Sequence, residues 1–355
     1  MPEKTLTDWQ SAAAKIQIDG RAFLNGQRSD SLSGETRPTM NPANGKKVAE
    51  VAYCDANDAD QAVKIARATF DSGVWAGMAP ADRKMVLVRW AELIENHADE
   101  IALLETLDVG KPIADTLNID VSATVRTIRW SGEAIDKVYD EISPTPSDCL
   151  ALVTRVPLGV VTAIVPWNFP LSTTAWKLAP SLATGNSVLL KPATNTPLSA
   201  LRIAELATEA GLPDGVLQVL PGSGNSLGKH LALHMDVDGL TFTGSTLVGK
   251  RLMEYSGKSN LKRTFLELGG KSPNIVFADC NLEKATSSAA LAVFYNGGQT
   301  CTAGTRLIVE ESILDEFLLK LVEHAKAWMP DNPLNPATTM GPMIDEAQCQ
   351  TVCDY

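Results

Sequence analysis

The 355-residue chain has few cysteines and no long apolar run. Its six cysteines follow no regular spacing, so we expect no disulfide framework and reduced thiols, as in the cytoplasm. The first twenty residues lack the apolar core of a secretory signal. No stretch approaches the roughly 18 apolar residues of a membrane span. These absences predict a cytoplasmic protein without a membrane partner.

Basic side chains are also scarce. The 31 lysines and arginines stand against 42 aspartates and glutamates, which gives a formal net charge of -11. This excess repels phosphate backbones, so we expect no nucleic-acid partner. With 45% hydrophobic residues the composition is that of a folded globular protein, and the length predicts more than one domain. A small molecule is the expected partner.

Short apolar runs recur in the second half of the chain, at 160–165, 187–190, 216–220, 239–242 and 264–268. They lie about 25 residues apart with helix-like segments between them, which is the spacing of successive βα units. Apolar strands without alternation indicate a parallel sheet that is covered on both faces. We therefore predict an α/β fold with a doubly wound, Rossmann-like parallel sheet.

Three regions follow from these changes of pattern. Residues 1–150 hold short strand-like pieces and helices that we expect to contribute to the Rossmann-like domain formed by residues 151–270. Residues 271–355 start a second α/β unit, and a helix start at 345–347 lies just before the chain ends. We expect this second domain to be incomplete.

Two glycine clusters are candidates for a phosphate-binding turn. The segment from Gly222 to Lys229 is close to the dinucleotide and P-loop fingerprints, but it has one residue too many between its glycines for either. The turn from Gly244 to Gly249 follows a predicted strand and opens a helix, whose free N–H groups can face a phosphate. Ser245 can cap this helix or donate its hydroxyl, and the residues leave both roles open.

Three side chains are candidates for catalysis. Cys301 follows glycines 297–298, which leave room for a substrate to reach a thiol; the alternative is a small buried residue in a loop. Glu267 ends a predicted strand at the edge where α/β sheets bind ligands, or it pairs with Lys271. Asn168 lies at the same edge and can donate to a developing oxyanion or satisfy a turn.

A metal site is not expected. His230 and His234 have the i, i+4 spacing of helical metal ligands, but the HLALH segment lacks the glutamate of HExxH. No third ligand is evident beside them in the sequence.

Five short motifs occur in the order and at the separations of one known family. They are PWNFP at 166–170, KPA at 191–193, FTGST at 242–246, ELGGKSP at 267–273 and GQTC at 298–301. Together they resemble the aldehyde dehydrogenase superfamily from about residue 20 onward. The segments DWQ at 8–10, LETLDVGKPI at 104–113 and FADC at 277–280 are closest to its aminoaldehyde branch. The resemblance implies oxidation of an aldehyde to a carboxylic acid with NAD or NADP as the cofactor.

The resemblance assigns roles to the candidate residues. Cys301 is the nucleophile that forms a thiohemiacetal and then a thioester, and Asn168 with the Cys301 amide holds the oxyanion. Glu267 is the general base for the water that releases the acid. A thiolate suits this chemistry because it is a soft nucleophile and a fair leaving group. The residues implied around the cofactor are Val165, Trp167, Lys191, Thr194, Gly224, Gly244, Ser245, Gly249 and Leu268.

The same resemblance places Phe169 and Trp176 along the aldehyde tunnel. Asp120, on a helix expected over 114–139, is the candidate partner of an amine or guanidine tail; the alternative is a solvated helix face. The expected substrate is therefore an ω-amino- or guanidino-aldehyde such as γ-glutamyl-γ-aminobutyraldehyde.

The chain also departs from the family pattern. Thr194 stands where NAD-preferring members carry a glutamate, so we expect NADP to be accepted as well as NAD. Gly297 replaces a glutamine, and the later carboxylate motif EEIFGP is absent. Two alternatives therefore stay open: a coenzyme A-acylating relative, which Glu267 disfavours, and a non-catalytic cofactor-binding fragment. For a full-length form we expect a homo-oligomer.

Overall fold

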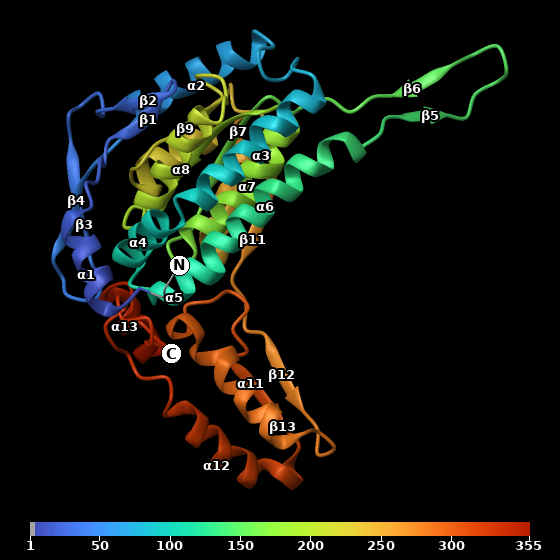
Figure 1. Ribbon diagram of the computed structural model, residues 1–355. Helices are drawn as coiled ribbons and strands as arrows, with labels where there is room; N and C mark the ends of the chain where they lie inside the picture. The colour runs from blue at the N-terminus through green and yellow to red at the C-terminus, as the bar shows by residue number, and fades with distance from the viewer. Residues whose placement is uncertain (1–3) are drawn as a thin grey trace.

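The computed structural model describes residues 4–355 (Figure 1). Its largest sheet has seven strands in the order β11-β10-β7-β8-β9-β1-β2. The parallel part consists of β7 (Val160–Ile164), β8 (Ser187–Lys191), β9 (Leu217–Val219), β10 (Gly239–Gly244) and β11 (Arg263–Leu268). The antiparallel strands β1 (Ala22–Leu24) and β2 (Gln27–Ser29) extend the β9 edge. The predicted parallel sheet is confirmed.

The winding of the sheet reverses beside β7. The chain passes outward from β7 through β8 to β9, and then returns to the other side of β7 with β10. In open α/β sheets, ligands bind outside the carboxyl ends of the strands at such a reversal. The residues that follow β7, β8, β10 and β11 therefore share the edge where a ligand is expected.

Helices cover both faces of the sheet, as a doubly wound fold requires. One face packs against α7 (Pro170–Ala183) and α8 (Leu198–Glu209), which are covered in turn by α3 (Pro80–Asn96), α4 (Ala98–Val109) and α6 (Ser122–Ala134). The other face packs against α2 (Ala56–Asp71), α9 (Lys229–Leu233) and α10 (Thr246–Lys258). Strand side chains alternate between these layers, since Ala163 lies in the first core and Ile164 in a core on the opposite face.

The second α/β unit is small. It consists of β12 (Pro273–Val276), α11 (Leu282–Phe294), β13 (Arg306–Val309) and α12 (Leu314–Ala325). β12 and β13 pair in parallel, and Val276, Ala289 and Phe317 form the core under the two helices. In Figure 1 this orange unit lies beyond the end of β11, which leads into it.

The remaining elements lie around these two units. The first segments are α1 (Leu6–Lys15) and the antiparallel pair β3 (Thr36–Met40) and β4 (Lys47–Ala52). α5 (Ile113–Asp115) and the π-helix η1 (Thr116–Val121) precede α6. The hairpin of β5 (Glu141–Ser143) and β6 (Ala151–Val153) projects from the body (Figure 1). α13 (Glu346–Asp354) is followed by Tyr355, whose ring lies beside the Lys271 ammonium.

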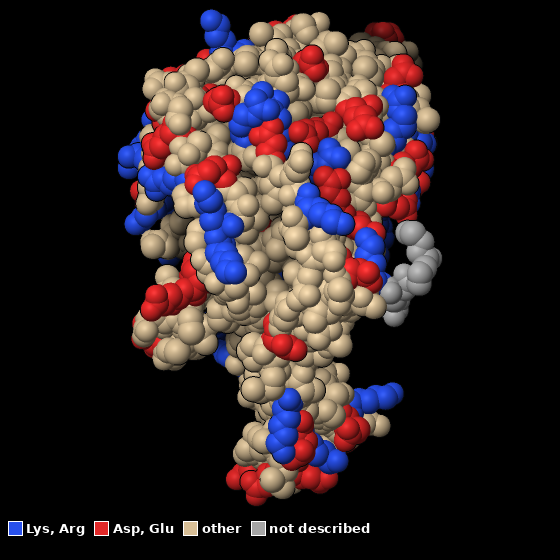
Figure 2. Space-filling model, turned by 60° about the vertical axis from the view of Figure 1, so that its left-hand side comes forward, with Lys and Arg blue, Asp and Glu red and all other residues tan. Residues whose placement is uncertain are grey.

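The surface carries charges of both signs. Figure 2 shows acidic and basic side chains interspersed over the broad body of the molecule. Within residues 4–355, no helix combines the length and the apolar character that crossing a membrane requires.

The buried Asp108 makes the free energy of unfolding depend on pH. Its buried carboxylate accepts hydrogen bonds from the Thr39 hydroxyl at 2.6 Å and the Leu198 N–H at 2.9 Å, and burial raises its pKa from 3.8 to about 7. The folded chain therefore holds this proton at pH values where the unfolded chain releases it. Because of this group, the free energy of unfolding falls as pH rises through that window, by on the order of 4 kcal/mol.

We expect Asp108→Asn to remove this component, because an amide does not titrate and still offers an acceptor to Leu198. Urea denaturation at several pH values measures it, with the exposed Asp71→Asn as the control. An identical pH slope in wild type and Asp108→Asn contradicts the assignment.

Candidate active site

The loop that carries the thiol reverses direction sharply. It follows η4 (Tyr295–Gly298), in which Asn296, Gly297 and Gly298 have φ values of 52°, 63° and 73°. This left-handed conformation is readily adopted by glycine and tolerated by asparagine, so the glycines are required by the turn itself. The turn leads through Gln299 to a half-buried Cys301, which is a free thiol.

Asn168 joins this loop to the end of β7. Its side-chain Nδ2 donates to the Gln299 carbonyl at 2.8 Å, and Asn296 Nδ2 donates back to the Asn168 carbonyl at 3.2 Å. Positions 131 residues apart in sequence are thereby held together. An amide nitrogen carries two N–H groups, so one donor of Asn168 is available to a ligand. The structure therefore brings the amide of Asn168 to the loop that ends in Cys301.

The Gln299 side chain ties the same loop to the C-terminal segment. Its Nε2 donates to the Asn296 carbonyl at 3.0 Å, and its Oε1 accepts from the buried Ile344 N–H at 3.0 Å. Both ends of the side chain are satisfied, which fixes the backbone two residues before the thiol.

Glu267 lies at the carboxyl end of β11, and its residue is exposed. The alternative partner Lys271 instead places its ammonium 4.1 Å from the centroid of the Tyr355 ring. A cation near Glu267 comes from α7: burial lowers the pKa of Lys177 to about 8, while the Glu267 charge opposes that shift. Lys177 was not among the candidates predicted from the sequence, although it is a lysine among the apolar, buried residues of a helix.

The first turn of α10 is exposed and begins with a side-chain cap. Ser245 is its N-cap, and the Ser245 hydroxyl accepts a hydrogen bond from the Val248 N–H at 3.3 Å. A Cβ at Gly249 would lie 2.6 Å from a methyl group of Leu268, so glycine there allows α10 to pack closely on β11. A Cβ at Gly244 would lie 2.4 Å from the Phe242 ring. Neither position has room for a larger side chain without displacing its neighbour.

Lys191 lies deep at the carboxyl end of β8. Its ammonium donates to the Pro192 carbonyl at 2.8 Å, and burial lowers its pKa to about 8. The Lys191 carbonyl accepts from the N–H of the buried Val165, which links the ends of β7 and β8 at 3.2 Å. Trp167 follows as a half-buried residue.

Two further residues line the outer side of this edge. The hydroxyl of the exposed Thr194 donates to the Gly222 carbonyl at 3.1 Å. Gly224 begins the π-helix η3 (Gly224–Gly228), and a Cβ added there would meet nothing within 4 Å. The space beside Gly224 is therefore open.

Asp120 is buried within the helical layer, so the alternative of a solvated helix face is wrong. It lies on η1, with one oxygen 2.6 Å from Lys111 Nζ and the other accepting from the Ser172 hydroxyl at 3.2 Å. The Lys111 ammonium in turn lies 3.8 Å from the centroid of the Phe169 ring. Asp120 therefore positions the buried Lys111 ammonium, which packs against the ring of Phe169.

Tyr295 and Asp115 lie in the same neighbourhood. The Tyr295 ring centroid is 6.3 Å from that of Phe169, and its buried hydroxyl has no partner among residues 4–355. Burial, Asp120 and Asp115 together raise the pKa of Tyr295. Trp176 lies elsewhere on α7, 51% exposed, in a surface depression shared with Arg155.

The comparisons with known proteins agree with this arrangement. The chain matches the model of the Aldehyde dehydrogenase family over residues 29–355. It is 52% identical over 351 residues to the NADP/NAD-dependent aldehyde dehydrogenase PuuC of Escherichia coli (strain K12), covering 99% of this chain and 71% of that protein. Fold and match together define an α/β oxidoreductase. The chain belongs to the aldehyde dehydrogenase family.

Solved structures are equally similar. The gamma-glutamyl-gamma-aminobutyraldehyde dehydrogenase from Burkholderia cenocepacia gives a TM-score of 0.98 at 53% identity, covering 99% of this chain and 71% of that one. The AldA indole-3-acetaldehyde dehydrogenase of P. syringae, in complex with NAD+ and IAA, gives 0.98 at 55% identity, covering 99% and 72%.

Gln299→Ala tests how the thiol loop is anchored. The substitution leaves the buried Ile344 N–H without its acceptor, which we expect to lower the free energy of unfolding by about 2 kcal/mol. Chemical denaturation measures the loss, and faster hydrogen exchange at Ile344 locates it. Gln350→Ala is the control, because that side chain bonds only to the exposed Asp354 in the described chain. Equal losses in both variants contradict the anchoring role.

Proposed function

We propose that this aldehyde dehydrogenase oxidises an ω-amino- or guanidino-aldehyde, such as γ-glutamyl-γ-aminobutyraldehyde, to its acid with NAD or NADP. The observation that carries the proposal is the 2.8 Å hydrogen bond between Asn168 and the thiol loop. The printed name of the Burkholderia relative supports the substrate class. The name of PuuC supports the use of both dinucleotides.

Cys301 loses its thiol proton to solvent, and the thiolate adds to the aldehyde carbonyl to form the C–S bond of a thiohemiacetal. Negative charge develops on the former carbonyl oxygen, where the second N–H of Asn168 and the Cys301 backbone N–H donate. A bound nicotinamide would supply the hydride acceptor for this carbon, which would leave a thioester on Cys301. The hydrogen bond to Gln299 fixes Asn168 before the charge appears, so little reorganisation is needed.

Glu267 releases the product. An exposed carboxylate at the end of β11 can take a proton from a water molecule as that water attacks the thioester. The C–S bond then breaks, and the thiolate of Cys301 leaves with the electron pair. This base supports a hydrolytic reaction over acyl transfer to coenzyme A.

The residues at the sheet edge fit a dinucleotide. The Thr243 hydroxyl is buried without a partner in the described chain, directly before the open N-terminus of α10. Gly244, Ser245 and Gly249 would face the pyrophosphate, with Leu268 packed behind, and Val165 and Trp167 would flank the nucleotide. Lys191 has N–H groups beyond the one that Pro192 accepts, which a ribose can take up. Thr194 is uncharged and would not repel the 2′-phosphate of NADP. Gly224 has open space beside it, which would accommodate that phosphate.

The substrate tail meets a cluster of charges. Asp115 and Asp120 with Lys111 carry a formal net charge of minus one when all three are ionised, and the cluster borders Tyr295 and Phe169. A cationic tail is attracted to this charge, and a polar tail gives the Tyr295 hydroxyl a partner. Trp176 would line the outer part of the path.

Residues 151–270, with contributions from 1–150, would hold the cofactor, and residues 271–355 the thiol. Six free thiols support a reducing, cytoplasmic location. A homo-oligomer is proposed.

Substitution of the two reacting groups separates the chemical steps. We expect Cys301→Ser to abolish turnover. Glu267→Gln should keep the first oxidation but slow thioester hydrolysis by about 100-fold or more, since a general base contributes that much. Reduced cofactor, followed by stopped-flow absorbance, should then appear as a burst and a slow phase. Cys349→Ser is the control for the thiol.

Other outcomes identify the alternatives. Equal steady-state rates for wild type and Glu267→Gln remove the base assignment. Formation of acyl-coenzyme A that depends on added coenzyme A indicates the acylating relative. An inert Cys301 together with no reduced cofactor indicates a non-catalytic cofactor-binding chain.

Asp115 predicts how substrate preference changes with pH. Burial raises its pKa to about 6, so this carboxylate is ionised above that pH and gains a proton below it. The attraction for a cationic tail is therefore present above about pH 6 and lost below. We expect KM for a short aminoaldehyde to rise by about tenfold between pH 7 and 5, while KM for propanal changes little.

In Asp115→Asn the aminoaldehyde should show the high KM at every pH. Asp148→Asn, an exposed aspartate of the β5–β6 hairpin loop, should behave as wild type. If aminoaldehyde and propanal show the same pH dependence in wild type, or if indole-3-acetaldehyde is preferred throughout, the assigned substrate class is wrong.

A further inference from the structure

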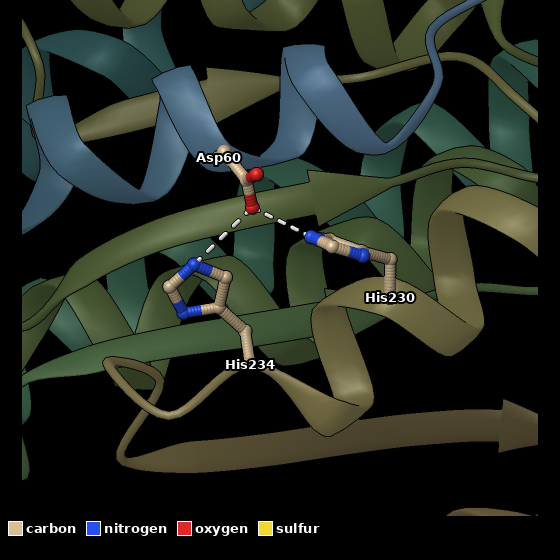
Figure 3. Close-up of side chains that lie close together, drawn as sticks. All are labelled: Asp60, His230 and His234. Atoms are coloured by element: carbon tan, nitrogen blue, oxygen red, sulfur yellow. Dashed lines mark hydrogen bonds and ion pairs between the residues drawn. The ribbon is translucent and has the colours of Figure 1, made fainter.

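Two histidines and one aspartate converge on the face of the sheet that α2 and α9 cover (Figure 3). His230 Nε2 lies 2.6 Å from Asp60 Oδ1, and His234 Nε2 lies 3.4 Å from the same oxygen. Asp60 is the third group that the sequence did not reveal, because it precedes His230 by 170 residues. One carboxylate oxygen thus stands between two imidazole nitrogens.

The backbone beneath these side chains is held by the core. Ala59 and Ala62 bury the side of α2 that flanks Asp60, and Leu231 and Ala232 bury the side of α9 between the histidines. Most of these small and apolar residues belong to one cluster with strand residues of the main sheet. The cluster of Asp60, His230 and His234 is therefore preorganised at the backbone, while its side chains stay partly exposed.

The distances suit a small divalent ion. Zn²⁺ binds imidazole nitrogen and carboxylate oxygen at about 2.0–2.2 Å, so neighbouring ligands of a tetrahedral ion are roughly 3.3 Å apart. The His234–Asp60 separation of 3.4 Å already matches this value. The 2.6 Å contact of His230 must open by roughly 0.7 Å, which rotation of a partly exposed side chain permits. All three ligand atoms lie within 4.8 Å of one another.

We propose that Asp60, His230 and His234 bind one divalent transition-metal ion, with Zn²⁺ as the representative. Two imidazoles and one carboxylate favour zinc, nickel and copper over magnesium and calcium, which prefer oxygen ligands. None of the three residues belongs to the candidate active site. The ion joins α2 to α9 and stabilises the fold, with water completing its coordination.

Binding requires one rearrangement of protons. A neutral histidine that coordinates through Nε2 carries its ring proton on Nδ1. His234 Nδ1 now accepts from the Asp236 N–H at 3.1 Å, so coordination ends that hydrogen bond. The freed N–H belongs to an exposed residue and can be hydrated, so the cost is small.

Calorimetric titration of the tag-free protein with Zn²⁺ tests the site. All variants carry Cys349→Ser and Cys353→Ser, because these exposed thiols have the same i, i+4 spacing on α13 and could bind zinc themselves. We expect one equivalent to bind, and Mg²⁺ to give no heat. Asp60→Asn and His230→Gln should each weaken binding by at least about tenfold. Zinc should also raise the melting temperature of the parent protein and not that of Asp60→Asn.

A matched control exists elsewhere in the chain. His324 Nε2 lies 3.1 Å from Glu283 Oε1, which is a histidine–carboxylate pair without a second histidine. His324→Gln should leave zinc affinity unchanged. The proposal is overturned if the parent binds no zinc, or if Asp60→Asn and His230→Gln bind it as the parent does. Melting curves without zinc establish that each variant is folded.

Discussion

The hydrogen bond from Asn168 to the Gln299 carbonyl is the contact on which the candidate active site depends. The amide belongs to the turn after β7, and the carbonyl belongs to a loop of the second α/β unit. Together with the hydrogen bond from Asn296 Nδ2 to the Asn168 carbonyl, this contact holds Asn168 beside the thiol loop, although the two belong to units that follow one another in sequence through β11 and β12. The left-handed turn at Asn296, Gly297 and Gly298 makes the contact possible, because it reverses the chain directly before Gln299.

Charged side chains are buried beside this contact, and their loss of hydration opposes folding. Lys111 and Asp120 are an ion pair with almost no exposure, and such pairs contribute little to stability because both charges lose water. The pair contributes by its position, because the Lys111 ammonium packs over the ring of Phe169, the residue after Asn168. Glu105 belongs to the same network, and it accepts from the Leu171 N–H at 3.1 Å in the first turn of α7. A polar network thus fixes the turn from which the amide donor projects.

The sequence predicted the parallel strands well and the contacts between distant residues poorly. β7 to β10 were found because each is a largely buried apolar run with a helix before the next strand. The edge strand β11, whose residues are exposed or half-buried, was found from its apolar residues alone. β5 and β6 were missed because they are short and mostly exposed, so no burial pattern marks them. Asp60 and Lys177 could not be recognised from the sequence, because their neighbours are distant along the chain. The fold places Asp60 beside His230 and His234, and Lys177 near Glu267. The motifs indicate Cys301, Glu267 and Asn168 as candidates, whereas the left-handed conformation of Gly297 is visible only in the backbone angles.

The central claim is that acyl transfer passes through the sulfur of Cys301. Mass spectrometry of Glu267→Gln, quenched in acid after one turnover with an aminoaldehyde and oxidised cofactor, tests it directly. We predict that the peptide containing Cys301 carries the mass of the acyl group, and that hydroxylamine removes it. An unmodified Cys301 peptide after reduced cofactor has formed, or an acyl group on another residue, would contradict the account.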